Sequence, residues 1–520
     1  MPGIGIDFGT TNSLIVAYNK VRNEFSYFNY ASGRGGLPIP TPSTVWYHDD
    51  KVEIGRVARE NINRYGDVEG HHFERSIKLK LGKEGHLNIF GTAVQPYKVA
   101  GAILSKLKQT AIEKYSALKV GADMNRAVFT VPINFNGQAR RDLRKSANEA
   151  GIDVTTFIHE PFAAVVGHFF SKYEKDNTET ILHRMKDLDG KYLLTFDWGG
   201  GTLDITVVTV QNGKMLELGT AELTNVAGDK FDEDIAKYAW DLVVRKYGSK
   251  YSEDYLEITR KKQWGRMLTS AEQCKLKLSR LDHADFFLER VTSPSEHLDF
   301  TITRAKFEEL ISYAINDAMN KVDEALRQAG IQDIDLSLVL LTGGSCYIPA
   351  VMDRMVEKFG RRVEKVKNAD LTIAQGAAVI AEMGWLPFLT KDTRVELSDG
   401  SYWPIFEHGM PVAAQEPAHN QEVFACVDQR QKRAKIIISE GLGQQNQILD
   451  VLNIPLLGDA RFGDDIVVDA ILDRDIILTV RGHSKMVHGY EENENYAIRK
   501  TTEIHQLCFG LDFAEGFRDA

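Results

Sequence analysis

With 520 residues, the chain is too long for one hydrophobic core, so we expect two to four domains. Its 43% hydrophobic and 26% charged residues are ordinary for a globular protein, and its net charge of −10 argues against nucleic acid and anionic membranes as general partners. The four cysteines lie far apart without a Cys-x-x-Cys pair, which argues against a disulfide framework and a zinc site.

The start of the chain shows no secretory signal, because strand-type residues begin at Ile4 without a basic and apolar leader before them. No apolar run reaches the roughly 18 residues that a transmembrane helix needs. We therefore expect a cytoplasmic protein that has neither a membrane nor a nucleic acid as its partner.

The first predicted element is a β-hairpin over residues 1–20 with glycine and threonine at its tip. Residues 5–11 read Gly-Ile-Asp-Phe-Gly-Thr-Thr, and Leu14, Ile15 and Val16 follow as the second strand. The glycines at positions 3, 5 and 9 do not have the spacing of a dinucleotide-binding fingerprint, and no helix pattern follows them directly.

Strand and helix patterns then alternate through residue 384, which predicts an α/β domain. The expected strands are residues 44–47, 52–54, 127–131, 155–158, 215–221, 286–291, 300–302 and 336–341. The expected helices are residues 99–117, 136–150, 231–247, 304–329, 350–359 and 374–383, one that opens at Glu160-Pro161 and one that ends at 272–279. Residues 33–42 and 172–190 are predicted to be loops, the second with room for one helical turn.

A second glycine-tipped hairpin is predicted at residues 195–204, Thr-Phe-Asp-Trp-Gly-Gly-Gly-Thr-Leu-Asp. Glycines let the backbone approach an anion closely, and successive N–H groups at such a turn can hold phosphate oxygens. Asp197 and Asp204 flank the glycines, and paired carboxylates are suited to a hydrated Mg²⁺. A glycine-rich turn with solvated acids would explain this stretch alone equally well. Its similarity to the first hairpin favours two lobes that face one nucleotide. No Walker-type Gly-x-x-x-x-Gly-Lys-Ser/Thr motif occurs.

The pattern changes after residue 393, where short β-type runs alternate with turn residues and predict an all-β domain. These runs are residues 423–427, 434–439, 447–452, 465–472 and 476–480. We expect an α/β domain over residues 1–384, a linker over 385–393, the β domain over 394–485 and a short, mostly polar tail over 486–520.

In this order, the motifs resemble the seventy-kilodalton heat-shock chaperone family of the DnaK type, most specifically in the α/β part. Residues 5–13 and 197–204 are similar to the two phosphate motifs of that family, and Lys78, four positions before Gly82, is similar to its catalytic lysine. Further matches are residues 41–43, Pro132 with Arg140 (the switch proline and its arginine), Glu160-Pro161, Gly228-Asp229, Glu272, Lys275, Ser279, residues 343–345 and Asp370. The β domain is a looser match, at Gly441, residues 454–455, Gly463 and residues 473–480.

The resemblance implies an actin-like, two-lobed ATPase domain followed by a β-sandwich that binds extended polypeptide. The implied catalytic residues are Lys78, Glu160, Asp197, Asp7 and Thr202, and the implied Mg²⁺ ligands, mostly through water, are Asp7, Glu160 and Asp197. The implied ATP- or ADP-binding residues are Gly9, Thr10, Thr11, Asn12, Gly199, Gly200, Gly201, Thr202, Gly228, Asp229, Glu272, Lys275, Ser279, Gly343, Gly344, Ser345, Tyr347 and Asp370. Slow hydrolysis is expected, with K⁺ as a further candidate ion and a J-domain co-chaperone and a nucleotide exchange factor as candidate partners.

Besides Phe8, where leucine is usual, and Ala227, where the family has a glycine, the chain departs from the family pattern in three features. Tyr347 and Leu276 stand where arginines commonly sandwich the adenine; an aromatic ring can still stack on the base, whereas leucine gives only apolar contact. The linker carries Pro387, so coupling between the domains is expected to differ. Too few residues follow position 485 for the family's helical lid, so we expect a lidless or short-lid member whose peptide binding is fast and weak.

Three functions are compatible with these residues. The first is an ATP-driven chaperone that binds extended apolar peptides. The second is a nucleotide-gated regulator or scaffold that binds one specific client protein, which the altered linker, adenine contacts and lid favour. The third, a small-molecule kinase of the same lobed superfamily, fits least well because such an enzyme needs no β domain.

Overall fold

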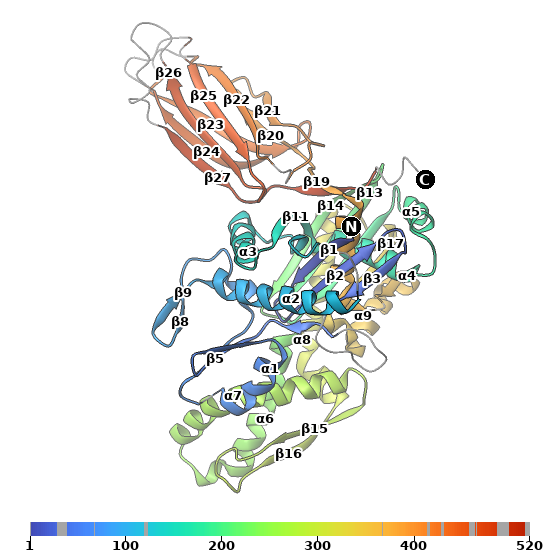
Figure 1. The fold of residues 1–520 in the computed structure, drawn as a ribbon, viewed down its shortest axis with the longest axis vertical. Coiled ribbons are helices and arrows are strands. Elements are labelled where there is room, and N and C mark those ends of the chain that lie inside the picture. Colours follow the sequence, from blue (N-terminus) through green and yellow to red (C-terminus); the bar gives the residue numbers. More distant parts are fainter. Residues whose placement is uncertain are drawn as a thin grey trace.

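The computed structural model describes residues 2–28, 39–66, 68–118, 123–366, 368–412, 416–427, 431–456, 463, 465–485 and 499–514. Figure 1 shows a two-lobed α/β body with a β-sandwich at one end of its long axis. This arrangement confirms the expected fold class, an α/β two-lobed domain followed by an all-β sandwich. No helix in the described part of the chain is long and apolar enough to cross a membrane.

The sheet of the first lobe is built around the first predicted hairpin. Its strands lie in the order β11-β10-β1-β2-β3; β1 and β10 are parallel, as are β10 and β11, whereas β1 and β2 are antiparallel. They are β1 (Gly3–Phe8), β2 (Asn12–Asn19), β3 (Glu24–Tyr27), β10 (Arg126–Val131) and β11 (Asp153–His159). The helices α2 (Pro96–Leu118) and α3 (Gly137–Glu149) share one apolar core with this sheet.

The second lobe repeats this topology with the strand order β18-β17-β12-β13-β14. Again the strand that leads to the glycine tip has its antiparallel hairpin partner on one side and two successive parallel strands on the other. The strands are β12 (Tyr192–Trp198), β13 (Thr202–Gln211), β14 (Lys214–Thr224), β17 (Leu336–Thr342) and β18 (Val363–Lys365). The helices that share a core with them are α6 (Gly228–Tyr247), α7 (Glu253–Leu278), α8 (Arg304–Ala329) and α9 (Pro349–Phe359).

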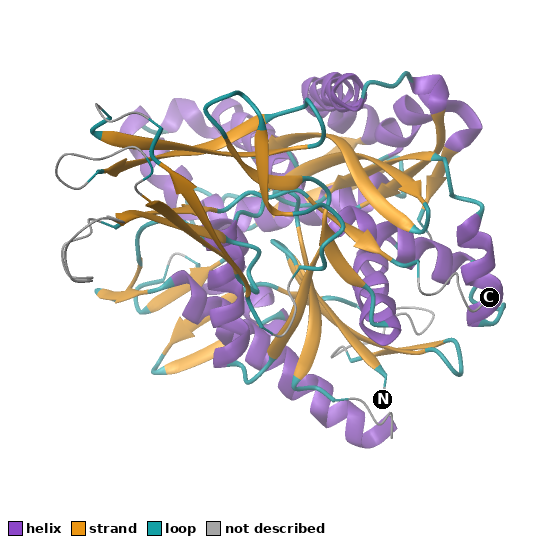
Figure 2. Cartoon of the chain, turned by 90° about the horizontal axis from the view of Figure 1, so that it is seen from above, coloured by secondary structure: helices purple, strands orange, loops and turns teal. Residues whose placement is uncertain are grey.

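Two further helices, α4 (Glu160–Lys172) and α10 (Ala369–Met383), share a core with strands of both sheets and so join the lobes. Figure 2 shows the helices around the strands when the molecule is seen from above. A Cβ built on Gly376 of α10 would lie 1.8 Å from the carbonyl oxygen of Ala163 in α4. Only glycine permits so close an approach of two backbones, which fixes the distance between these helices.

Smaller elements complete the two lobes. They are β4 (Thr41–Pro42), β5 (Val45–His48), β6 (Lys51–Ile54), β7 (His71–Glu74), β8 (Leu87–Ile89), β9 (Thr92–Val94), β15 (His283–Leu288), β16 (Leu298–Thr303), α1 (Arg56–Tyr65), α5 (Thr178–Lys186) and the 3-10 helix η1 (Ile77–Lys80). One of them, β4, pairs with β2 of the first-lobe sheet. The loop expected at residues 172–190 is wrong, because α5 is a full helix there. Asn177 caps it by accepting the Thr180 N–H at 2.8 Å, and its apolar side chains join the core beside α4.

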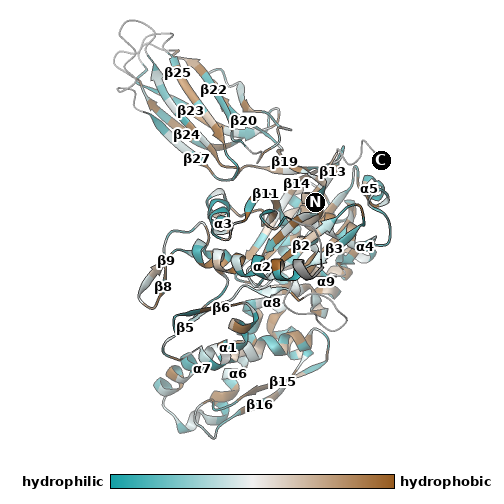
Figure 3. Ribbon diagram, viewed as in Figure 1, coloured by the Kyte–Doolittle hydropathy of each residue, from teal (hydrophilic) through white to brown (hydrophobic). Residues whose placement is uncertain are grey.

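The sandwich consists of two sheets with the strand orders β21-β20-β23-β24 and β22-β25-β26-β27. Its strands are β20 (Asp392–Glu396), β21 (Tyr402–Phe406), β22 (Ala418–Ala425), β23 (Arg433–Gly441), β24 (Gln447–Pro455), β25 (Asp465–Leu472), β26 (Leu478–Lys485) and β27 (Lys500–Ile504). Figure 3 shows hydrophilic and hydrophobic segments side by side in these strands, as expected where one face of each sheet meets the core.

Two short strands connect the sandwich with the second lobe. β28 (Phe509–Asp512) pairs with β14, and β19 (Leu386–Leu389) pairs with β28, so the second-lobe sheet continues in the order β14-β28-β19. The structure thus differs from the expected linker at 385–393 and tail at 486–520. The linker contains a strand of the lobe, and the tail supplies one strand to the sandwich and one to the lobe. Polar β27 and short β28 gave little local signal, because their partners lie far away in the sequence.

Candidate functional site

The two glycine-tipped hairpins have the same register. In the first, Asp7 lies opposite Leu14 and Phe8 opposite Ser13, and the tip is residues 9–11. In the second, Asp197 lies opposite Asp204, and the tip is residues 199–201. Each tip is therefore preceded by an aspartate and a buried aromatic residue. The internal repeat that the sequence predicts is therefore also seen in the structure, as two hairpins of the same register.

The two tips face each other closely. A Cβ built on Gly200 would lie 2.0 Å from the hydroxyl oxygen of Thr11, and one on Gly201 would lie 3.0 Å from Cγ2 of Thr10. The Thr11 hydroxyl is buried and has no hydrogen-bond partner among the residues that the structure describes. A buried polar atom without a partner is costly, so a ligand oxygen at this position fits the site.

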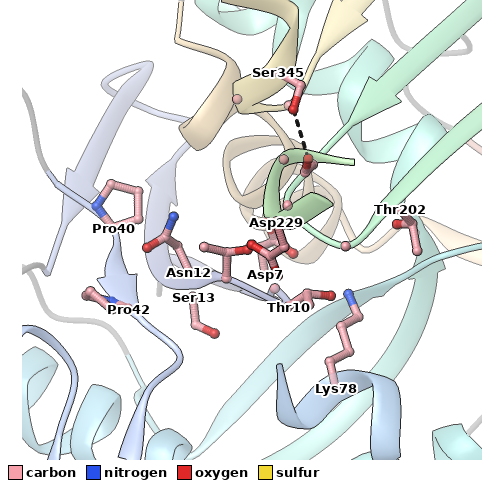
Figure 4. Close-up of a pocket in the computed structure, with 18 of the residues that line it drawn as sticks. Asp7, Thr10, Asn12, Ser13, Pro40, Pro42, Lys78, Thr202, Asp229 and Ser345 are labelled. Atoms are coloured by element: carbon pink, nitrogen blue, oxygen red, sulfur yellow. Dashed lines mark hydrogen bonds between the residues drawn. The ribbon is translucent and has the colours of Figure 1, made fainter. Parts of the chain in front are cut away.

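A cleft of about 1920 Å³ lies between the lobes and opens around these tips. Every residue predicted from the sequence to be catalytic or to bind nucleotide lines it, with the exception of Asp370, whose side chain lies outside the described residues. Figure 4 shows the Lys78 amine directed into the cleft toward Thr10, opposite the second hairpin. The first phosphate hairpin, the second hairpin, η1 and the start of α4 therefore meet at one place.

Lys78 is 6% exposed and donates a hydrogen bond of 2.7 Å from Nζ to Oε1 of Glu160. Glu160 is the first residue of α4, where Pro161 begins the helix without losing a backbone bond. Burial acts to lower the pKa of Lys78, but the carboxylates of Glu160 and Asp7 outweigh it and raise this pKa. The lysine is therefore a buried cation at neutral pH.

The cleft also gathers carboxylates. Burial and the neighbouring charge of Glu160 raise the pKa of Asp197 well above its usual value and that of Asp204 to about 7. Asp204 accepts a hydrogen bond of 2.8 Å from Thr202, and Asp7 accepts one of 3.0 Å from Thr130. A bound cation would offset the mutual repulsion of these buried carboxylates, so the cluster is a suitable place for one.

Among the described residues, no group of three or more His, Cys, Asp or Glu side chains is arranged to hold an ion directly. A hydrated Mg²⁺, which keeps most of its waters, is compatible with this spacing because its contacts to carboxylates run through those waters. The donor set therefore fits the expected water-mediated site, and Asp7, Glu160 and Asp197 remain its candidate residues.

The start of α6 is fixed against the second hairpin. The N–H groups of Gly228 and Asp229 donate to the carbonyl oxygens of Gly199 and Gly200 at 3.1 and 2.7 Å. Lys275 holds this helix start from α7 through bonds of 2.7 Å to the Gly228 oxygen and 2.8 Å to Asp232. The start of α6 therefore holds the glycine tip of the second hairpin in place.

The segment after β17 forms the other wall of this end of the cleft. Ser345 donates a hydrogen bond of 3.0 Å to the carbonyl oxygen of Gly199, shown dashed in Figure 4. A Cβ built on Gly343 would lie 2.5 Å from Asp197 Oδ1, so this turn passes directly over the base of the second hairpin. The predicted residues 343–345 therefore lie beside the second hairpin and across the cleft from the first.

The two positions that depart from the family pattern both line the cleft. The Tyr347 ring lies under the Lys365 amine at 4.0 Å, and its hydroxyl accepts the Ala369 N–H at 3.3 Å. These contacts hold the ring in one place, which suits a stacking surface. Leu276 is 59% exposed and offers only apolar contact.

Two charged residues of this region carried no sequence signal. Arg59 of α1 pairs across the cleft with Glu272 of α7, and Asp232 is the buried partner of Lys275. Both lie on ordinary amphipathic helices, so no local spacing marks them. Only the contact between helices distant in the sequence shows their place at the site.

Comparison with known proteins agrees with this geometry. Residues 3–505 match the family described as Hsp70 protein. The chain belongs to the Hsp70 family. It is 28% identical over 505 residues to the chaperone protein DnaK of Mycoplasmopsis pulmonis, an alignment that covers 94% of this chain and 78% of that protein. The family recognised from the sequence motifs is therefore confirmed.

Members of the Hsp70 family are ATPases that bind ATP or ADP with Mg²⁺, and they typically bind polypeptides, J-domain proteins and exchange factors. In this Hsp70-family chain, Arg140 of α3 joins the first lobe to the sandwich. Its guanidinium donates to the carbonyl oxygens of Asp475, Ile476 and His505 at 2.6, 3.2 and 3.1 Å. Ile476 has a φ of 57°, which is strained for a β-branched residue.

Arg140 also connects back to the cleft. It donates at 2.6 Å to the carbonyl oxygen of Phe135, and the Phe135 N–H donates to the Pro132 oxygen at 3.0 Å. The Lys78 amine lies 5.9 Å from the centre of the Phe135 ring. A short run of contacts therefore links Lys78 in the cleft to the turn at residues 473–477 of the sandwich.

Proposed function

We propose that this Hsp70-family protein is an ATP-dependent molecular chaperone that hydrolyses ATP slowly to control the binding of extended polypeptide segments. The observation that carries this proposal is the buried Lys78–Glu160 pair at 2.7 Å, beside both phosphate hairpins. A buried ion pair adds little stability by itself, because desolvation offsets most of its attraction. Its position in the cleft is better explained by chemistry on a phosphate.

In the proposed mechanism, the N–H groups and hydroxyls of residues 9–12 and 199–202 hold the β- and γ-phosphate oxygens from two sides. Lys78 offsets the charge that develops on the γ-phosphate and positions the attacking water. When bound, Mg²⁺ neutralises phosphate charge, and Asp7, Glu160 and Asp197 would hold it mostly through its waters. K⁺ is a further candidate ion, and Thr202 would contact the transferred group.

The adenosine would occupy the wall formed by α7 and the segment after β17. Glu272, Lys275 and Ser279 belong to α7, and residues 343–345, Tyr347 and Asp370 follow β17. We propose that Tyr347 stacks on the base in place of a guanidinium. Gly228 and Asp229 would lie near the phosphates, where their N–H groups hold the backbone of the glycine tip in place.

Nucleotide state would reach the sandwich through Phe135 and Arg140. A γ-phosphate that draws Lys78 toward itself would change the contact of this amine with the Phe135 ring, and the Phe135 carbonyl is one of the acceptors of Arg140. We propose residues 1–384 as the ATPase domain and the sandwich as the polypeptide site, in a cytoplasmic protein that works with a J-domain partner and an exchange factor.

A second function has its own support: a nucleotide-gated regulator or scaffold that binds one specific protein. The linker strand β19 is paired with β28 instead of lying against β14 directly. A linker that is fixed by pairing on both edges is expected to keep the sandwich docked on the lobes. This favours binding of one specific partner to the docked protein and disfavours repeated cycles of peptide capture and release.

ATP turnover, measured alone and with an unfolded apolar peptide, separates these functions. A chaperone is expected to hydrolyse ATP slowly and to be stimulated by the peptide, and Lys78→Ala should abolish both rates. Turnover that is indifferent to peptides would favour the partner-specific regulator. Nucleotide binding without turnover would contradict the proposed ATPase.

A further inference from the structure

The seam between the second lobe and the linker is filled by the strand β28. This strand pairs on one side with Lys214 and Met215 of β14 and on the other with residues 386–389 of β19. The Phe513 N–H extends the first pairing by donating to the Gly213 oxygen at 2.9 Å. We call residues 509–513 the strap, because they connect the linker to the lobe.

Hydrogen bonds on both edges fix the linker strand. Thr390 donates its N–H to the Cys508 oxygen at 3.2 Å, next to the strap. On the opposite edge, the Pro387 oxygen accepts the Val412 N–H at 2.9 Å. The peptide groups of Pro387 therefore face away from the strap, so the missing N–H of this proline costs no bond with it.

The strap also packs as part of the core. Phe509 and Leu511 are buried, and Phe513 is fully buried with its ring 5.5 Å from that of Trp385. The Phe509 ring lies 3.8 Å from the ring of buried His159 in β11. A Cβ on Gly510 would lie 2.4 Å from the Met215 oxygen, so the strand spacing here requires glycine. These contacts show that the strap occupies a well-packed site between the linker strand and the two lobes.

The chain enters and leaves the sandwich at this same seam. β19 leads into β20, and β27 leads into the strap through Cys508, whose N–H donates at 2.8 Å to Glu440 of the sandwich. Lys391 lies between the two paths, with its amine 3.3 Å from the Cys508 sulfur and 3.8 Å from Glu440. The sandwich is thus fastened to the lobe by both of its connections.

We propose that the strap locks the linker strand against the second lobe and thereby keeps the sandwich docked on the ATPase body whichever nucleotide is bound. Moving the sandwich away from Arg140 would require the strap to leave its seat, because β19 cannot leave as a single strand. Release of the strap, rather than the nucleotide alone, is then the step that frees the sandwich.

Hydrogen exchange of two backbone N–H groups tests this lock in the full chain. The Thr390 N–H reports the strap, and the Gly137 N–H, which donates to the His505 oxygen at 2.9 Å, reports the docking of the sandwich on α3. Gly510→Val should unseat the strap, and both groups should exchange at least about tenfold faster, with the Gly190 N–H of the lobe unchanged. The control Glu407→Gln changes an exposed side chain in the loop after β21, outside the strap, and should alter neither.

Two results would overturn the proposal. One is a Gly137 N–H that stays protected after Gly510→Val has exposed Thr390. The other is a wild-type chain in which ADP or ATP exposes Gly137 while Thr390 stays protected, because the sandwich would then leave with the strap in place.

A disulfide across the seam tests the same lock if Gly510→Val fails to fold. Leu386 and Asp512 are directly opposite in the register, so Leu386→Cys with Asp512→Cys, in a Cys508→Ser background, should form a bridge under oxidation. The oxidised chain should exchange the Gly137 N–H about tenfold more slowly than the reduced chain. Equal exchange in the two forms would show that docking does not depend on the strap.

Discussion

Lys78 and Lys80 lie on the same turn of 3-10 helix but in opposite environments. Lys78 is buried in the cleft beside Glu160, whereas the side chain of Lys80 is 41% exposed and pairs with Glu74 at the edge of the lobe. The sequence distinguishes them only through the spacing of Lys78 from Gly82. The structure adds the physical difference, which is that the Lys78 ammonium is buried beside the phosphate hairpins, whereas the Lys80 side chain is partly exposed outside the cleft.

Tyr347 should carry much of the affinity for the adenine. Replacing it with alanine removes the ring that Lys365 and Ala369 hold in place, so we expect ADP to bind about tenfold more weakly, in line with about 1–3 kcal/mol for stacking on a base. Leu276→Ala is the matched control, since this side chain is mostly exposed, and should change affinity less. Isothermal titration with ADP measures both, and equal effects would argue against stacking.

Glu217 should make the stability of the protein depend on pH. This side chain faces Lys391 of the linker, Glu440 of β23, His159 of β11 and Cys508. Burial, opposed by Lys391 and reinforced by Glu440, raises its pKa from the usual 4.5 to about 7, while burial keeps His159 neutral by lowering its pKa to about 3.

Because folded Glu217 holds its proton up to about pH 7, whereas the unfolded chain releases it near pH 4.5, the native state binds more protons in this window. The free energy of unfolding should therefore fall as the pH rises from 4.5 to 7. Glu217→Gln should remove the part of this fall that Glu217 contributes, while the part due to Asp197 and Asp204 remains. The variant should be more stable than wild type at pH 8 by up to about 3 kcal/mol, with no difference below pH 4.5. Urea denaturation across this range checks it, with surface Glu233→Gln as control. Parallel curves for wild type and Glu217→Gln would contradict the assignment.

At the scale of elements, the crossing of α4 and α10 sets the distance between the two lobes. Gly376→Ala places a methyl group against the Ala163 carbonyl, and overpacking of this kind costs about 1–3 kcal/mol. Gly265→Ala in α7 is the matched control, because its Cβ would lie 3.8 Å from the nearest atom, on Ile62, and alanine favours a helix. Chemical denaturation should show destabilisation for the first variant and none for the second. Equal stability of the two would contradict the close crossing.

Elements with a strong local signal were predicted from the sequence. The two hairpins were found because glycines between apolar runs mark a strand, a turn and a strand, and α8 because its apolar stripe ends at Gly330, which has a φ of 68°. Helix α5 was missed because its few apolar residues stand among charges. Strands β27 and β28 were missed because long-range pairing, and not composition, makes them strands.

The candidate site was predictable to a similar extent. Motif residues such as Lys78, Glu160 and Gly199 could be named, because phosphate chemistry requires particular residue types at fixed spacing. Arg59 and Asp232 could not, since each acts through a partner on another helix. The joint at Arg140 was expected from its motif, but its acceptors are backbone carbonyl groups, which carry no sequence signature.

At the scale of the whole molecule, the cleft is closed by a contact between the outer parts of the two lobes. Arg59 of α1 pairs with Glu272 of α7, and both side chains are less than a quarter exposed. Arg59→Ala should let the lobes open more readily and release ADP about fivefold faster, as expected for the loss of about 1 kcal/mol. The control Arg56→Ala removes an exposed pair with Glu60 on the same helix and should leave release unchanged. Stopped-flow release of a fluorescent nucleotide measures both, and identical rates would contradict a role in closure.

The most direct test of the account is the hydrolysis of ATP already bound to the protein, in a single turnover, by wild type, Lys78→Ala and Lys80→Ala. All three proteins should bind ATP. Lys78→Ala should hydrolyse it at least about 100-fold more slowly and Lys80→Ala should be close to wild type, because Lys78 lines the cleft and Lys80 does not. A Lys78→Ala chain that hydrolyses ATP at the wild-type rate would contradict the account, as would equal losses in the two variants.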